Sequence, residues 1–138
     1  MNRLTQHYHD VAQRRLTNFI RSRYPLITVI PTQGVFNYRC YLNAIQYALD
    51  HEGLEVTEVI YLNDGTPILH YVNYNPKTDT YHETTTGFLA AYYEYYRLRT
   101  IHPDDYKYMQ AEFDRAVDSW TQQFTTKFQR WLGVERIL

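Results

Sequence analysis

The stretch LEVTEVIYLNDGTPILHYVNYNPKTDTYHETTT, residues 54–86, decides the fold. Its β-branched and aromatic residues gather in short runs that are typical of strands, and these runs cover residues 54–62, 67–74 and 79–86. Asn63-Asp64-Gly65-Thr66 separates the first two runs and carries an Asp-Gly hairpin signal. Asn75-Pro76-Lys77-Thr78 separates the last two and is a turn sequence. The stretch therefore predicts three sequential antiparallel strands.

A helix is predicted upstream of these strands, because apolar residues recur at spacings of three and four between Leu4 and Ile20. Pro25 ends this helix. Residues 26–30 are predicted to form a strand or an extended segment, and residues 32–39 a loop. A second amphipathic helix begins near Cys40 and stops at Gly53.

The segment downstream of the strands is rich in aromatic residues between Phe88 and Tyr96, and its pattern fits either a helix or irregular structure. Residues 98–101 are a candidate last strand. Pro103 occupies a first helical position, followed by two aspartates, and opens a long helix whose apolar period continues to Gly133.

The length of 138 residues and the 44% hydrophobic composition predict a single domain over residues 1–138. The order of elements predicts the α+β class. Its expected parts are an N-terminal helix, a central helix that starts at Cys40 and packs on a small antiparallel sheet, and a long C-terminal helix.

Composition argues against several classes of function. A net charge of −1 provides no basic field for a nucleic-acid backbone. We expect no membrane span and no signal peptide, because long apolar runs are missing, and the lone cysteine fits a reducing cytoplasm. The five glycines are scattered and form no phosphate-binding loop. His7 and His9 point in different directions on a helix, so neither a metal nor a cofactor is expected.

Cys40 is the candidate chemical centre. It follows a loop and heads an amphipathic helix, where backbone N–H groups favour a thiolate. A thiolate is the nucleophile of cysteine hydrolases and acyltransferases. The alternative is that the lone cysteine is a small buried hydrophobic residue.

His70 interrupts an otherwise hydrophobic predicted strand, and a polar residue in such a strand needs a hydrogen-bond partner. If the turn covers residues 75–78, His70 faces Glu83 on the next strand, where a carboxylate orients and charge-stabilises an imidazole. A slip of one residue places Thr84 opposite His70 and makes His82 the alternative base. The other interpretation of the pair is an exposed polar contact on an edge strand.

The order of these residue types resembles the papain-like and transglutaminase-like superfamily of thiol enzymes. The resemblance rests on residues 39–44, 68–73 and 81–84, in which a cysteine heads a helix and a histidine and an acid follow on adjacent antiparallel strands. It implies that Cys40 is the nucleophile, His70 the general base and Glu83 the orienting acid. A glutamate is less usual than an aspartate in the third role, so this sequence departs from the family pattern there.

Acyl transfer also requires donors for the oxyanion. The backbone N–H of Cys40 is one candidate, and the side chains of Gln33 and Asn37, both in the preceding loop, are others. Both side chains also fit the role of satisfying turn backbone, and this role suits Asn37 better. The resemblance places a glutamine a few residues before the cysteine, and Gln33 matches that position loosely. The candidate residues of a substrate cleft are Tyr38, Tyr41, Asn73 and Tyr93.

Two functions follow from the sequence. The first is a small cysteine-dependent hydrolase or acyltransferase that acts on an amide, peptide or thioester without a cofactor. The second is a non-enzymatic protein-binding module, such as a phage-type inhibitor of a host factor, that uses a surface rich in its 15 tyrosines. Both expect a protein or peptide as substrate or partner and leave the oligomeric state open. The distance between the thiol of Cys40 and the imidazole of His70 distinguishes them.

Overall fold

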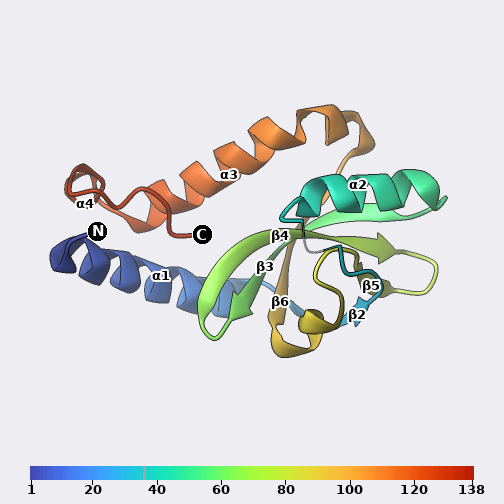
Figure 1. Ribbon diagram of the computed structural model, residues 1–138, viewed down its shortest axis with the longest axis horizontal. Coiled ribbons are helices and arrows are strands. Elements are labelled where there is room, and N and C mark those ends of the chain that lie inside the picture. Colours follow the sequence, from blue (N-terminus) through green and yellow to red (C-terminus); the bar gives the residue numbers. More distant parts are fainter. Residues whose placement is uncertain (36) are drawn as a thin grey trace.

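The computed structural model describes residues 1–35 and 37–138 and confirms the mixed α+β class (Figure 1). Residue 36, in the predicted loop 32–39, lies outside the described residues. The elements follow in the order α1 (Arg3–Arg23), β1 (Leu26–Ile27), β2 (Val29–Pro31), α2 (Cys40–Asp50), β3 (Glu55–Asn63), β4 (Thr66–Asn75), β5 (Thr80–Glu83), η1 (Gly87–Tyr92), β6 (Glu94–Ile101), η2 (Pro103–Tyr108), α3 (Met109–Phe124) and α4 (Lys127–Trp131).

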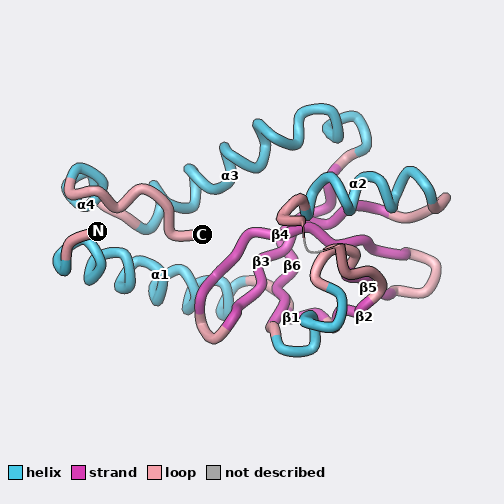
Figure 2. The backbone as a smooth tube through the Cα atoms, viewed as in Figure 1, coloured by secondary structure: helices cyan, strands magenta, loops and turns pink. Residues whose placement is uncertain are grey.

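The sheet is larger than the small antiparallel sheet that the sequence predicts. It has six strands in the order β1-β6-β3-β4-β5-β2, and β2 pairs parallel to β5. The predicted segment 26–30 divides into β1 and β2, which form the two opposite edges of this sheet. Only Thr28 separates them in the chain, and adjacent Cα atoms are about 3.8 Å apart. The sheet must therefore curl until its two edges meet at Thr28, and Figure 2 shows β1 and β2 close together.

Local signals explain the elements that the sequence predicts well. Asn2 caps α1, accepting a hydrogen bond from the backbone N–H of Thr5 at 2.8 Å, and Tyr24 is extended because Pro25 follows it. The Asp-Gly hairpin forms between β3 and β4, with positive φ at Asp64 and Gly65. Both residues adopt the left-handed conformation that this tight turn requires.

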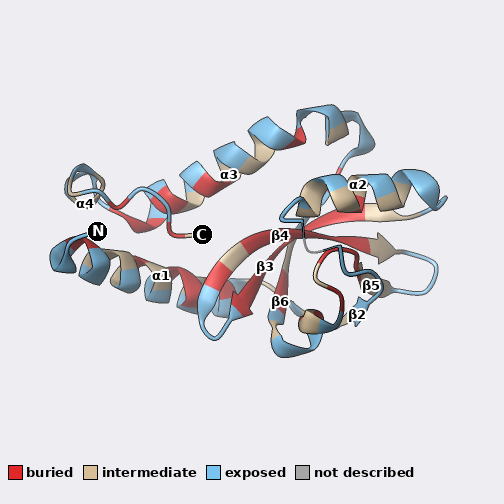
Figure 3. Ribbon diagram, viewed as in Figure 1, coloured by how far each residue is buried: buried red, intermediate tan, exposed pale blue. Residues whose placement is uncertain are grey.

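The curled sheet has an inner and an outer face. The inner face is filled by apolar residues from all six strands, and this cluster includes Ile27, Val29, Val59, Tyr61, Ile68, Val72, Tyr81 and Tyr95. The helices cover the outer face, where Leu69 packs with α1 and α3, and Tyr71 packs with α2. Neighbouring residues of a strand point to opposite faces, so His70 of β4 belongs to the inner face. Figure 3 shows β3, β4 and β6 largely buried, while α1, α2 and α3 carry long exposed surfaces.

The β4–β5 pairing differs from the predicted register. The turn covers residues 76–79, so Tyr74 lies opposite Tyr81 and not opposite Asp79. Asp79, with φ of 53°, forms part of the turn. This change moves the partner by two residues, and an even shift leaves every side chain on the same face of the sheet. Glu83 therefore still shares the inner face with His70.

Two further predictions need correction at the C-terminal side. Residues 87–92 form a short 3-10 helix, and the last strand begins at Glu94 rather than at residue 98. The long C-terminal helix predicted from Pro103 is divided: residues 103–108 form a 3-10 helix, α3 begins at Met109, and Thr125 is extended (φ −129°, ψ 150°). Thr126 and Gln129 then start α4 through a reciprocal capping box.

Within the described residues, no helix has both the length and the apolar character needed to cross a membrane.

Candidate functional site

The site lies at a gap in the sheet beside β4. β5 pairs with β4 only at residues 73–75, so the described part of the chain places no strand beside the preceding part of this edge. The N-terminus of α2 lies here, and its first residue is the half-buried Cys40. Cys40 comes from the outer face and His70 from the inner face. The gap is where side chains from the two faces meet.

His70 and Glu83 form a buried pair on the inner face. The His70 ring nitrogen Nε2 lies 2.8 Å from Oε2 and 3.0 Å from Oε1 of Glu83. The two side chains are 4% and 0% exposed, so water does not compete for this contact. Because Nε2 is engaged by the carboxylate, Nδ1 remains for the thiol. The Cys40 side chain lies beside the same imidazole and contributes to raising the pKa of His70.

The carboxylate of Glu83 is held by a set of donors that fixes its orientation. The phenolic O–H of Tyr95 donates to Oε2 at 2.7 Å. The backbone N–H groups of Thr85 and Thr86 donate to Oε1 at 2.9 and 3.1 Å. Two further N–H groups, of Thr32 and Gln33, donate to the backbone carbonyl of Glu83 at 2.9 Å each. Both the side chain and the backbone of the acid are therefore fixed.

These contacts shift the pKa values of the pair in opposite directions. Burial lowers the pKa of His70, but the hydrogen bonds and charges of Cys40 and Glu83 outweigh burial and raise it to about 9. Burial raises the pKa of Glu83, but His70, Tyr95 and the N–H of Thr85 outweigh burial and lower it to about 2. At neutral pH the pair is therefore an imidazolium beside a carboxylate.

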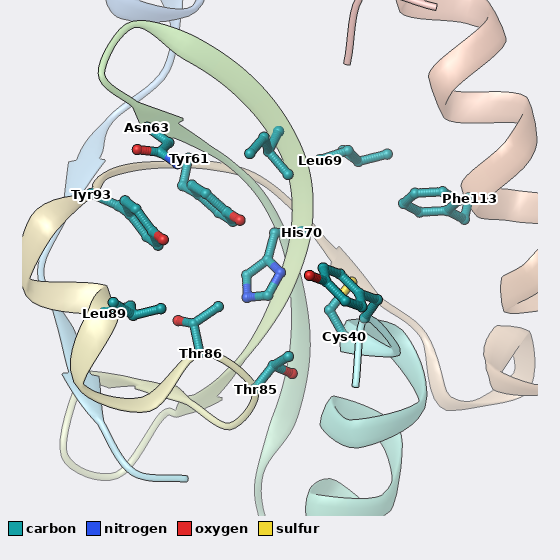
Figure 4. Close-up of a pocket in the computed structure, with 12 residues that line it drawn as sticks. Cys40, Tyr61, Asn63, Leu69, His70, Thr85, Thr86, Leu89, Tyr93 and Phe113 are labelled. Atoms are coloured by element: carbon teal, nitrogen blue, oxygen red, sulfur yellow. The ribbon is translucent and has the colours of Figure 1, made fainter. Parts of the chain in front are cut away.

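A cavity of about 500 Å³ opens onto Cys40 and His70 (Figure 4). Tyr61, Asn63, Leu89 and Tyr93 lie on one side of the imidazole in this view, while Leu69 and Phe113 lie on the other. The remaining lining residues are Tyr38, Ile68, Thr85 and Thr86. Cavities of this size accommodate small molecules or one or two residues of a peptide.

The candidate donors for the oxyanion lie in different surroundings. Asn37 belongs to a turn, where its Oδ1 accepts the N–H of Arg39 at 3.0 Å and the side-chain amide of Asn43 at 2.9 Å. Its own amide donates to Asn43 at 3.3 Å. Gln33 is exposed and does not line the cavity. Arg39 precedes α2 without a side-chain capping hydrogen bond among the described residues.

The four residues predicted to line a substrate cleft fall into two groups. Tyr38 and Tyr93 line the cavity, and Tyr38 has a left-handed backbone with φ of 58°. Tyr41 instead packs against Tyr71 and Phe113, and its hydroxyl donates to Gln110 at 2.6 Å. Asn73 is buried, and its amide donates to the Ala44 carbonyl at 2.8 Å, which ties β4 to α2. Tyr41 and Asn73 therefore serve the packing of α2, not the cavity.

His82, the alternative base, lies outside the site. Its two ring nitrogens contact the hydroxyls of Thr32 at 3.1 Å and Thr80 at 2.8 Å. The described residues also contain no group of three or more His, Cys, Asp or Glu side chains that could hold a metal ion. The pairing of His70 with Glu83 is thus the one that the fold selects.

The sequence analysis missed the residues that support Glu83. Tyr95 belongs to β6, and its contact with Glu83 depends on the order of strands in the curled sheet. Thr85 and Thr86 lie two and three residues after the acid, and a carboxylate followed by a turn that returns its N–H groups is a local signal that was available. Tyr61 carries no such signal, although its ring meets the His70 ring edge-on at a centroid distance of 5.1 Å.

No protein-family model, curated protein or solved structure matches this chain.

Proposed function

We propose that the chain is a cysteine-dependent hydrolase or acyltransferase that acts on an amide, peptide or thioester carbonyl. Cys40 is the nucleophile, His70 moves the proton and Glu83 orients the imidazole. One observation carries the proposal: Nε2 of a buried histidine is held by both oxygens of a buried carboxylate, while the same ring interacts with a half-buried cysteine in the wall of a cavity.

The ionisation of the pair suits the resting state of a thiol enzyme. His70 holds a proton at neutral pH because its pKa is raised to about 9. In thiol enzymes a protonated histidine next to the nucleophilic sulfur supplies the proton for the leaving group. The low pKa of Glu83, about 2, keeps the carboxylate charged, and the charge stabilises the imidazolium.

The chemical steps then follow from these positions. The sulfur of Cys40 forms a bond to the carbonyl carbon, and the carbonyl electrons move to its oxygen. When the intermediate collapses, the bond to the leaving amine or thiol breaks and His70 transfers its proton to that group. A thioester remains on Cys40. His70 next accepts a proton from water or from an acceptor amine or thiol, which attacks the thioester and releases the sulfur.

The start of α2 suits the oxyanion. The first N–H groups of a helix have no partners inside the helix, and the positive end of the helix dipole lies beside them. Arg39 supplies no side-chain cap among the described residues, and we assign the N–H of Cys40, the first of the helix, to the developing negative charge. This backbone donor supports the proposal more directly than Gln33 or Asn37.

The test is the rate at which Cys40 reacts with iodoacetamide as a function of pH. The chain has a single cysteine, so mass spectrometry counts the reaction at one site. We expect fast alkylation well below the ordinary cysteine pKa of about 8.5. His70→Ala should remove this advantage, whereas the matched control His82→Ala should keep it.

Two results of the alkylation experiment would contradict the enzyme proposal. A thiol that stays inert until the protein unfolds contradicts the enzyme proposal and leaves the protein-binding module as the better explanation. Equal rates in the wild-type protein and in His70→Ala at every pH also contradict it, because the imidazole then has no effect on the sulfur.

A further inference from the structure

The cavity continues beyond the imidazole into an aromatic compartment, formed by Tyr61, Tyr93 and Leu89 (Figure 4). The rings of Tyr61 and Tyr93 are stacked, with centroids 4.5 Å apart and an interplanar angle of 13°. Tyr61 also meets His70 edge-on. The compartment is thus built from packed rings on the inner face of the sheet and begins at the imidazole itself.

Charge limits what the compartment can bind. The described residues that line the cavity include no Lys, Arg, Asp or Glu. A charged group that entered would lose water and would meet only Cys40 and His70, which already face each other, and the imidazolium is also paired with Glu83. An uncharged group avoids this cost.

The walls also favour a particular shape. Aromatic rings pair best in offset-stacked or edge-on arrangements. The half-buried ring of Tyr93 contributes to the cavity wall, while its neighbour Tyr92 is 76% exposed and does not line the cavity. A planar ring therefore makes better contacts in this compartment than a flexible polar chain.

We infer that the aromatic compartment binds an uncharged aromatic group of the substrate, close to the carbonyl that Cys40 attacks. The inference rests on the proposed function, because that function places the carbonyl between Cys40 and His70. It narrows the substrate class to amides, peptides or thioesters with a neutral ring near the reactive bond.

The test measures binding without reaction, in the Cys40→Ala protein. Ligand-observed NMR compares phenylacetamide with the charged succinamate and with acetamide. We expect phenylacetamide to bind most tightly, and Tyr93→Ala to weaken its binding by at least about threefold. Tyr92→Ala is the matched control and should bind normally. Leu89→Trp, which fills the compartment, should abolish binding and gives a second readout if Tyr93→Ala fails to fold.

Two results overturn the inference: succinamate binding as tightly as phenylacetamide, or phenylacetamide binding unchanged in both Tyr93→Ala and Leu89→Trp. The alkylation experiment separates this failure from failure of the proposed function. An activated Cys40 without preference for the ring refutes the inference alone. An inert Cys40 with selective binding of the ring refutes the enzyme and supports the compartment.

Discussion

The substitution Glu83→Gln tests the electrostatics of the site directly. Glutamine keeps the shape of the side chain and can still accept the N–H groups of Thr85 and Thr86, but it removes the charge that faces the imidazolium. Burial alone lowers the pKa of His70. The contact with Cys40 still raises it, so we expect this pKa to fall from about 9 toward the ordinary histidine value of about 6.5. A full return to that value corresponds to about 3 kcal/mol.

The assay is an NMR titration of the His70 ring in the wild-type protein and in the variant. Glu52→Gln is the matched control, because Glu52 is exposed on the turn that follows α2. It should leave the His70 titration unchanged. A His70 pKa that stays near 9 in Glu83→Gln would refute the reasoning. A wild-type value near 6.5 would refute it too, because the carboxylate would then not stabilise the imidazolium.

Three further predictions concern stability. First, the free energy of unfolding depends on pH through His70 and Glu83. The contribution of His70 is complete below about pH 6.5 and is lost as the pH rises through about 9. The contribution of Glu83 is complete above about pH 4.5 and is lost as the pH falls through about 2. Urea unfolding across this range should show both losses, and a high-pH loss of the same size in His70→Ala would contradict the assignment. Second, Tyr95→Phe leaves a buried carboxylate oxygen without its 2.7 Å donor and should cost about 1–3 kcal/mol, whereas Tyr92→Phe should cost nothing measurable by the same unfolding assay. Third, Gly87→Ala should lower the melting temperature, because its Cβ would lie 2.9 Å from the Cα of Gly34 and φ is 55° there. The matched control is Gly53→Ala, which also has positive φ but no heavy atom within 4 Å of the new Cβ, so equal losses in the two variants would show that crowding at Gly34 does not matter.

Local signals allowed much of the fold to be predicted from the sequence. The Asp64-Gly65 hairpin, the end of α1 before Pro25 and the start of α2 at Cys40 each depend on a few adjacent residues. The division of residues 26–30 into β1 and β2 could not be predicted, because these strands form only where β6 and β5 supply their hydrogen-bonding partners. The end of α3 at Phe124 could not be predicted for a different reason, because the apolar period of the sequence continues past Thr125.

In the candidate site too, some contacts could be predicted from neighbouring residues, and others depend on residues far apart in the chain. The contact of His70 with Glu83 follows from the alternation of faces along two neighbouring strands, and it survives the two-residue change of register. The role of Tyr95 depends on the order of strands in the curled sheet, which no short pattern contains. Asn73 was misassigned although the same alternation applies, because it lies three residues after His70 on β4 and so points to the opposite face.

The position of Thr28 between the two edge strands has a consequence for how this protein opens. An isolated sheet usually frays from its edges, and an exposed edge also recruits strands of other molecules. Here β1 and β2 belong to one short segment, so releasing either edge pulls on the other. Amide protons of both edges should therefore exchange with solvent in a single cooperative event. A chain cut next to Thr28 should lose that cooperativity and become prone to self-association.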